Sequence, residues 1–168
     1  MANTTFSGPI RSESTIKTIS KNATTGAITE VTTLGGAPVS LSDGNVTLTN
    51  ATHSGRILLV PDGGQDNTYT LPAPIAGSVF RFVYAGGAAD ATDALIITPG
   101  NTNFYIGGIT HLDTNADNVT VFSNGSSNSS VQLNVPQAFD ITIMGLNTTN
   151  YQIFGTVTST TVPAFADQ

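Results

Sequence analysis

The chain has 168 residues, a formal net charge of −6 at pH 7, no Cys, no Trp and only 10% charged residues. Without Cys there can be no disulfide framework, thiol nucleophile or Cys-ligated zinc site. An acidic chain with five basic residues is also unsuited to binding the phosphates of duplex nucleic acid. We therefore expect a structural or binding protein with no enzyme activity, no cofactor, no metal and no nucleic-acid partner.

The first 36 residues differ from the rest of the chain in charge. Residues 1–36 contain three basic and two acidic side chains, a net charge of +1, whereas residues 37–168 contain two basic and nine acidic side chains, a net charge of −7. The first segment is rich in Ser and Thr and ends in Gly35-Gly36, which is typical of a hinge. We interpret residues 1–36 as an extended N-terminal arm, with short extended stretches at Ser14–Ser20 and Ala27–Leu34.

After the arm, apolar and polar residues alternate with period two between Gly, Asn, Asp and Pro, which is typical of β-strands. The clearest strand is Ser78–Tyr84, where Phe80, Phe82 and Tyr84 share one face and Arg81 lies between valines on the other. It predicts one apolar and one mixed face. In chain order, strands are expected at Asn45–Thr49, Arg56–Val60, Thr68–Leu71, Ser78–Tyr84, Ala94–Thr98, Asn103–Ile106, Val119–Ser123, Val131–Val135, Phe139–Met144 and Tyr151–Val157.

About ten strands at spacings of roughly 8–15 residues are typical of a sandwich, a jelly roll or a barrel. We predict an all-β fold, with a β-sandwich or jelly-roll-like body over residues 37–158. The extended N-terminal arm precedes this body, and residues 159–168 form a C-terminal tail. No apolar run reaches the length of a membrane span, so no membrane partner is expected.

His111 is the candidate for a catalytic histidine, and His53 is the candidate for a ligand. His111 and Asp113 would share one face of a strand. A catalytic triad would need a serine brought beside them by folding, and the sequence has no nucleophile-elbow motif. A turn-stabilising or surface role is favoured for His111, and His53 is interpreted as part of a turn.

Two acidic segments carry side-chain oxygens at short spacing. Calcium-binding loops coordinate the ion through oxygens spaced in this way. They are residues 113–118 (Asp-Thr-Asn-Ala-Asp-Asn) and residues 62–67 (Asp-Gly-Gly-Gln-Asp-Asn). In the first, Asn118 replaces the glycine of a calcium loop and Asn124 replaces the closing Glu. Polar turns are the favoured interpretation, with calcium binding as the alternative.

Arg81 is one of only five basic residues. The favoured interpretation is an arginine at a sheet edge whose stem packs along apolar surface. The alternative is an arginine that pairs with an Asp or anchors an interface.

Residues 2–13, Ala-Asn-Thr-Thr-Phe-Ser-Gly-Pro-Ile-Arg-Ser-Glu, resemble the start of small virion proteins of marine tailed phages, including cyanophages. A looser similarity extends over most of the body. It resembles phage capsid decoration proteins in which a strand, Leu-Pro-x-Pro and Gly-x-x-Phe-x-Phe recur. The segments that carry it are Ser54–Val60, Tyr69–Pro74, Gly77–Val83, Gly107-Gly108 and Asn150–Thr156.

This resemblance implies a head decoration (cement) protein on the capsid exterior, which stabilises the phage capsid by binding the shell of the major capsid protein. It implies no catalytic residues, and it makes a homotrimer an expectation. The N-terminal arm would contact the major capsid protein through apolar anchors and charge pairs. The residues expected at this contact are Phe6, Ile10, Arg11, Ile16, Lys17 and Ile19.

The alternative function is a receptor- or glycan-binding module of a tail fibre or surface knob. Recognition would then lie in the loops Gly86–Asp93 and Ser123–Ser130, with Tyr84, Phe104 and Tyr105 as aromatic platforms. The absence of Trp makes this function less favoured, because large aromatic rings supply the contact area of such platforms.

Overall fold

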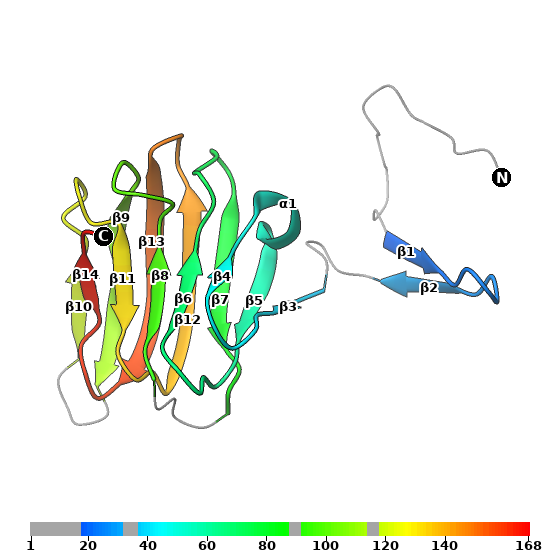
Figure 1. Ribbon diagram of the computed structural model, residues 1–168, viewed down its shortest axis with the longest axis horizontal. Coiled ribbons are helices and arrows are strands. Elements are labelled where there is room, and N and C mark those ends of the chain that lie inside the picture. Colours follow the sequence, from blue (N-terminus) through cyan, green and yellow to red (C-terminus); the bar gives the residue numbers. More distant parts are fainter. Residues whose placement is uncertain (1–17, 32–36, 88–91, 114–117) are drawn as a thin grey trace. The chain divides into compact units, whose positions relative to one another are not determined.

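The computed structural model describes residues 18–31, 37–87, 92–113 and 118–168 (Figure 1). The chain divides into two compact units, residues 1–36 and residues 37–168. In the first unit, β1 (Thr18–Lys21) and β2 (Ile28–Val31) pair as an antiparallel hairpin. The described part of the segment predicted as an extended arm is therefore a β-hairpin.

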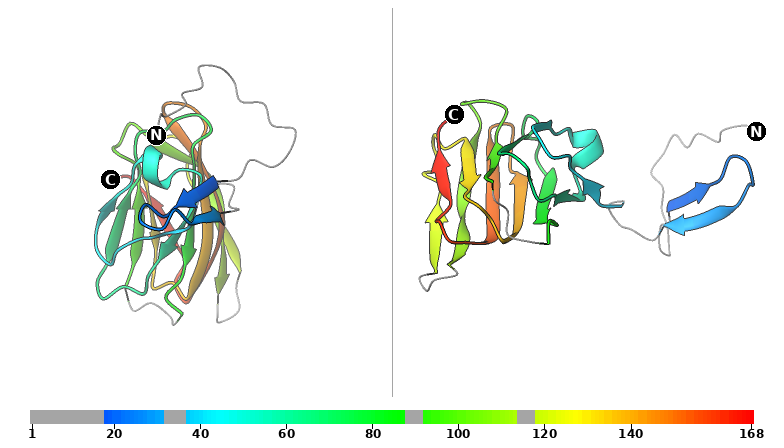
Figure 2. Two further views of the ribbon diagram at one scale, coloured as in Figure 1. Left: turned by 90° about the vertical axis from the view of Figure 1, so that its right-hand side faces the viewer. Right: turned by 60° about the horizontal axis from the view of Figure 1, so that its bottom comes forward.

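Residues 37–168 fold as a β-sandwich, which confirms the predicted all-β class; Figure 2 shows its two sheets as two layers. Within the described residues, a seven-stranded sheet has the order β10-β9-β13-β12-β7-β5-β3, and a five-stranded sheet has the order β14-β11-β8-β6-β4. The larger sheet comprises β3 (Val39–Ser40), β5 (Arg56–Val60), β7 (Val79–Tyr84), β9 (Phe104–Asp113), β10 (Val119–Phe122), β12 (Ala138–Gly145) and β13 (Asn150–Ser159). The smaller sheet comprises β4 (Val46–Thr47), β6 (Asn67–Thr70), β8 (Ala94–Ile97), β11 (Ser130–Leu133) and β14 (Ala164–Ala166).

Period-two alternation places one face of each long strand in the core between the sheets. In β7, Phe80 and Phe82 are fully buried while Arg81 points outward, as the sequence predicted. The same alternation holds through β12 and most of β13. Each fully buried large apolar side chain stabilises the fold by about 1.5–3 kcal/mol relative to exposure, so this alternation fixes which face of each sheet is inside.

Two buried tyrosines of the larger sheet bond to the backbone of the smaller layer. Tyr105 of β9 donates its hydroxyl to Ile96 O of β8 (3.1 Å), and Tyr151 of β13 donates to Pro72 O (2.8 Å), just after β6. Burial raises the pKa of both hydroxyls. These bonds satisfy both hydroxyls within the core and join the layers at fixed points.

The segment expected as a C-terminal tail, residues 159–168, contains the strand β14. β14 pairs with β11 in the smaller sheet, and the Gln168 side chain donates to Thr98 O (2.8 Å). The strand expected to end at Ile106 also continues through Gly107-Gly108 to Asp113.

No helix in the described residues is long and apolar enough to cross a membrane. The one helix assigned there, α1 (Asn50–His53), is a single turn.

Candidate binding surface

The side of the larger sheet that faces away from the smaller sheet is termed the outer face. Strand alternation assigns it the outward side chains of β5, β7, β12, β13, β9 and β10. These residues are Ile57, Leu59, Val79, Arg81, Val83, Asp140, Thr142, Met144, Gln152, Phe154, Thr156, Thr158, Phe104, Ile106, Gly108, Thr110, Leu112, Thr120 and Phe122.

Strand register aligns several of these residues in one row across the outer face. Arg81 pairs with Thr142, and Thr142 pairs with Phe154. The parallel register of β13 with β9 places Phe154 level with Gly108, which in turn pairs with Phe122 of β10. Residues far apart in sequence therefore form a continuous strip of surface.

Gly108 lets the Phe122 ring lie close to the sheet. A Cβ at this position would collide with the backbone of β10 and with the Phe122 ring. Phe122 is 69% exposed and Phe154 is 49% exposed, so two aromatic rings flank the glycine on the outer face. This makes the β10 side of the face apolar.

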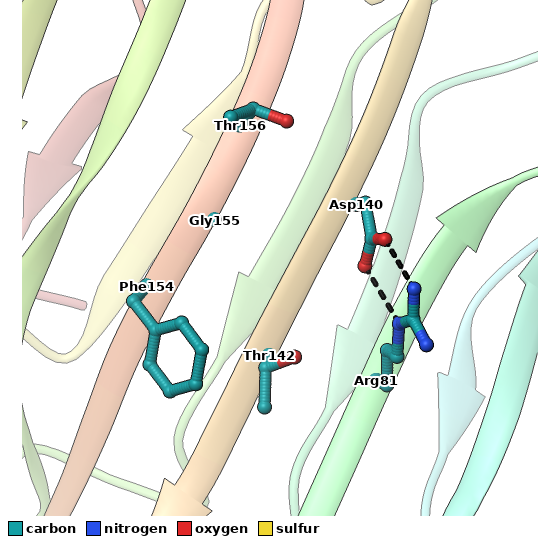
Figure 3. Close-up of a pocket in the computed structure, with 6 residues that line it drawn as sticks. All are labelled: Arg81, Asp140, Thr142, Phe154, Gly155 and Thr156. Atoms are coloured by element: carbon teal, nitrogen blue, oxygen red, sulfur yellow. Dashed lines mark hydrogen bonds and ion pairs between the residues drawn. The ribbon is translucent and has the colours of Figure 1, made fainter.

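Arg81 and Asp140 form a bidentate ion pair on the outer face (Figure 3). Arg81 Nε donates to Asp140 Oδ1 (2.8 Å) and Arg81 Nη2 donates to Asp140 Oδ2 (2.5 Å). The hydrogen bond with Arg81 lowers the pKa of Asp140, and the same pair raises the pKa of Arg81. The prediction of a sheet-edge arginine is wrong, because β7 lies between β12 and β5; the alternative, pairing with an Asp, is the one observed.

A shallow hollow of about 400 Å³ lies beside this pair, lined by Arg81, Asp140, Thr142, Phe154, Gly155 and Thr156. In Figure 3 the Phe154 ring and the Arg81–Asp140 pair lie on opposite sides of Thr142. Gly155 has φ +149°, and a Cβ there would collide with the backbone of β12. The hollow offers one aromatic ring, two hydroxyls and an ion pair whose charges offset each other.

The fold brings a serine to His111, but inside the core. His111 Nε2 lies 3.0 Å from Ser159 Oγ and 3.1 Å from Ser159 O, and Ser159 Oγ donates to Thr161 O (2.7 Å). Because the Ser159 hydroxyl already donates its proton to Thr161 O, His111 Nε2 must act as the donor to Ser159. This is the reverse of a base that activates a serine, where the imidazole accepts the serine proton.

Both side chains are fully buried, and His111 Nδ1 has no hydrogen-bond partner. The favoured turn or surface role for His111 is therefore wrong, because β9 continues through this residue and turns it into the core. His53 lies in α1, where its Nδ1 accepts from Thr49 N (3.0 Å).

The acidic segment at residues 62–67 is bonded to neighbouring loops. Asp66 accepts from Asp93 N (2.9 Å), and the Asp93 carboxylate accepts from Gln132 Nε2 (2.6 Å) and Val135 N (2.9 Å). Residues 114–117, in the other acidic segment, lie outside the described residues. In the described parts of the chain, no group of three or more His, Cys, Asp or Glu is placed to hold a metal ion.

Most of the predicted contact residues of the arm, Phe6, Ile10, Arg11, Ile16 and Lys17, lie outside the described residues. Ile19 lies in β1 and pairs with Glu30 of β2.

Among the aromatic platforms proposed for glycan binding, Tyr105 is fully buried, so that prediction is wrong. Tyr84 is partly buried and packs against Phe139 (ring centroids 5.7 Å apart), and Phe104 is partly buried. Sequence reasoning missed Phe154, although alternation with Tyr151 and Ile153 already put it on the opposite face.

In comparisons with known proteins, the chain matches no protein-family model and no curated protein sequence.

Proposed function

We propose that this chain is a virion structural protein that decorates and stabilises the capsid of a tailed phage by binding the shell of its major capsid protein. The observation that carries the proposal is the division into a small N-terminal unit of net charge +1 and a sandwich of net charge −7. The N-terminal unit also contains the residues that resemble the start of marine phage virion proteins.

The proposal assigns different tasks to the two units. A short segment rich in Ser and Thr can contact a partner surface along its length. The sandwich has its own core of buried residues in two layers, and its surface carries few charges.

Co-sedimentation with empty capsid shells of the parent phage tests this function. We expect the full chain to bind the shells saturably, and a chain lacking residues 2–34 to lose binding while keeping the circular dichroism of a β-sandwich. A matched pair of full-length variants sharpens the result. Phe6→Ser with Ile10→Ser should weaken binding, and Val162→Ser, which changes an exposed apolar residue of the sandwich, should not.

Undiminished binding by the shortened chain would overturn the role of the arm. No binding by the full chain would overturn the decoration function itself.

One observation favours glycan binding as a second candidate function. The exposed Phe154 ring lies beside a bidentate Arg–Asp pair in a shallow hollow, and a sugar can stack on a ring while its hydroxyls bond to such charged groups. A glycan array tests this candidate. Binding by the wild type that is lost in Phe154→Ala would support glycan binding, and no binding to any glycan on the array would contradict it.

A further inference from the structure

We propose that the outer face of the larger sheet is a dimer interface, on which a second copy of this chain packs the same face about a two-fold axis. This inference does not depend on capsid binding. It differs from the homotrimer implied by the resemblance, because a face that packs on itself closes as a pair.

The apolar content of the outer face is the first reason. Phe122 is 69% exposed, Phe154 49%, Leu112 38% and Ile57 37%. Strand pairing places Ile57, Phe154 and Phe122 in the same cross-sheet row, so these side chains belong to one surface. Arg81 and Thr142 lie between Ile57 and Phe154 in this row, so the largest exposed apolar side chains are the rings of Phe154 and Phe122. Aromatic rings are enriched at protein interfaces.

The charge of the face is the second reason, and it favours a second copy of the chain as the occupant. Arg81 and Asp140 are the only charged residues among the outward positions of the described strands that form the outer face, and they neutralise each other. Residues 37–168 as a whole carry a net charge of −7, so two copies repel each other through most of their surface. The neutral outer face is where two acidic sandwiches can approach without this penalty.

The arrangement of charges on the face also matches itself. Arg81 and Asp140 lie side by side, and their side chains are 48% and 44% exposed, so each has capacity for a second partner. A two-fold axis beside the pair sets the arginine of one copy against the aspartate of the other, giving an alternating network of four charges. Interfaces are enriched in aromatic residues and arginine and poor in other charges, which is the composition seen here.

Threonine hydroxyls supply neutral hydrogen-bonding groups next to this network. Thr156, Thr110 and Thr120 are paired in one row across β13, β9 and β10. The hydroxyls of Thr110 and Thr120 lie 3.4 Å apart. Such groups can bond to a second copy without adding charge.

The size of the face fits a small dimer interface. Six strands about 4.8 Å apart and four outward rows about 6.8 Å apart cover about 500 Å² of sheet. A pair of faces therefore buries about 1,000 Å², at the lower end for specific protein interfaces. We expect a reversible dimer with a dissociation constant in the micromolar range.

Sedimentation equilibrium of the full chain over a concentration series around the micromolar range tests the proposal without any capsid. We expect a reversible monomer–dimer equilibrium. Phe154→Ser and Phe122→Ser should each weaken dimerisation at least tenfold, as for central aromatic residues of an interface. Val162→Ser, which alters an exposed apolar residue between β13 and β14, is the matched control and should leave the equilibrium unchanged.

A charge exchange tests the two-fold pairing itself. Arg81→Asp makes the pair wholly acidic and Asp140→Arg makes it wholly basic, so each variant alone should dimerise more weakly than the wild type. An equimolar mixture of the two should form a heterodimer, because an acidic pair then faces a basic pair. Circular dichroism confirms that each variant is folded, and the phenylalanine variants provide an independent test.

A wild-type chain that stays monomeric, or that forms a trimer, would overturn the proposal. So would a dimer that the phenylalanine variants do not weaken, or a mixture of charge variants that associates no better than its components. None of these outcomes bears on capsid binding, so failure of this inference is distinguishable from failure of the proposed function.

Discussion

Arg81 and Asp140 pair on central strands but remain about half exposed, and solvent therefore limits what the pair contributes to stability. Exposed ion pairs typically stabilise a protein by about 0.2–1 kcal/mol. The bidentate geometry holds both side chains in place, so the Arg81–Asp140 pair stabilises the fold more than a flexible surface pair does.

The pH dependence of this pair follows from the lowered pKa of Asp140. The folded state binds the proton less readily than the unfolded state, so the stabilisation is present above the ordinary carboxyl pKa of 3.8 and is lost as pH falls through the lower folded pKa. We expect Asp140→Asn to reduce the free energy of unfolding by no more than about 1 kcal/mol at neutral pH, and the two proteins to converge in acid. Urea unfolding across this pH range measures both; a difference that grows in acid would contradict the sign.

Gly155 is required by its backbone conformation and by its neighbour strand. Its φ is +149°, and a Cβ would collide with backbone atoms of Asp140 and Ile141, which cannot rotate away. We expect Gly155→Ala to lower the free energy of unfolding by about 2–4 kcal/mol. Gly100→Ala is the control, because a Cβ at Gly100 meets nothing within 4 Å, and it should change stability by less than about 0.5 kcal/mol. Equal effects in chemical denaturation would contradict this explanation.

At the scale of elements, β9 and β13 join the two layers through the hydroxyls of Tyr105 and Tyr151. Removing one hydroxyl leaves a buried carbonyl without its donor. We expect Tyr105→Phe to cost about 1–3 kcal/mol of unfolding free energy, measured by thermal or urea denaturation. A neutral or stabilising effect would show that this bond does not stabilise the sandwich.

The same tyrosines predict alkaline unfolding. Because burial raises the pKa of both hydroxyls in the folded state, the unfolded state ionises first, and the associated stability is complete below the ordinary tyrosine pKa of 10.0. It is lost as pH rises above that value. We expect the free energy of unfolding to fall above pH 10, together with a rise in tyrosinate absorbance, and Tyr105→Phe with Tyr151→Phe to make this fall much shallower. An equally steep fall in the double variant would contradict the assignment.

The alternation of side chains explains why much of the sandwich could be predicted from sequence. It places Phe80 and Phe82 inside and Arg81 outside without knowledge of the partner strands. The continuation of β9 through Gly107-Gly108 was missed because glycine carries no side-chain pattern. The short strand β14 was missed because three residues are too few to show alternation.

The outer face could be predicted only in part for a related reason. Alternation within β13 already assigns Phe154 to the side opposite the core. The neighbours of Phe154 depend on strand order, and β9 pairs in parallel with β13 although 46 residues separate their paired positions. The Arg81–Asp140 pair spans 59 residues of sequence, so no local pattern contains it.

At the scale of the whole molecule, the chain combines a small N-terminal unit with an acidic sandwich whose outer face is neutral. The carboxylates of Asp66 and Asp93 accept bonds from loop residues, and His111 is enclosed in the core. These side chains serve the fold. The exposed groups on the outer face provide the contact area on which the proposed dimer depends.

Cryo-electron microscopy of the intact parent virion tests the proposed function most directly. We expect density that accommodates the sandwich of residues 37–168 at regularly repeated positions on the outside of the capsid, with the N-terminal unit in contact with the major capsid protein. A particle whose capsid exterior carries no such density, or one in which the sandwich occurs only on a tail fibre, would contradict it.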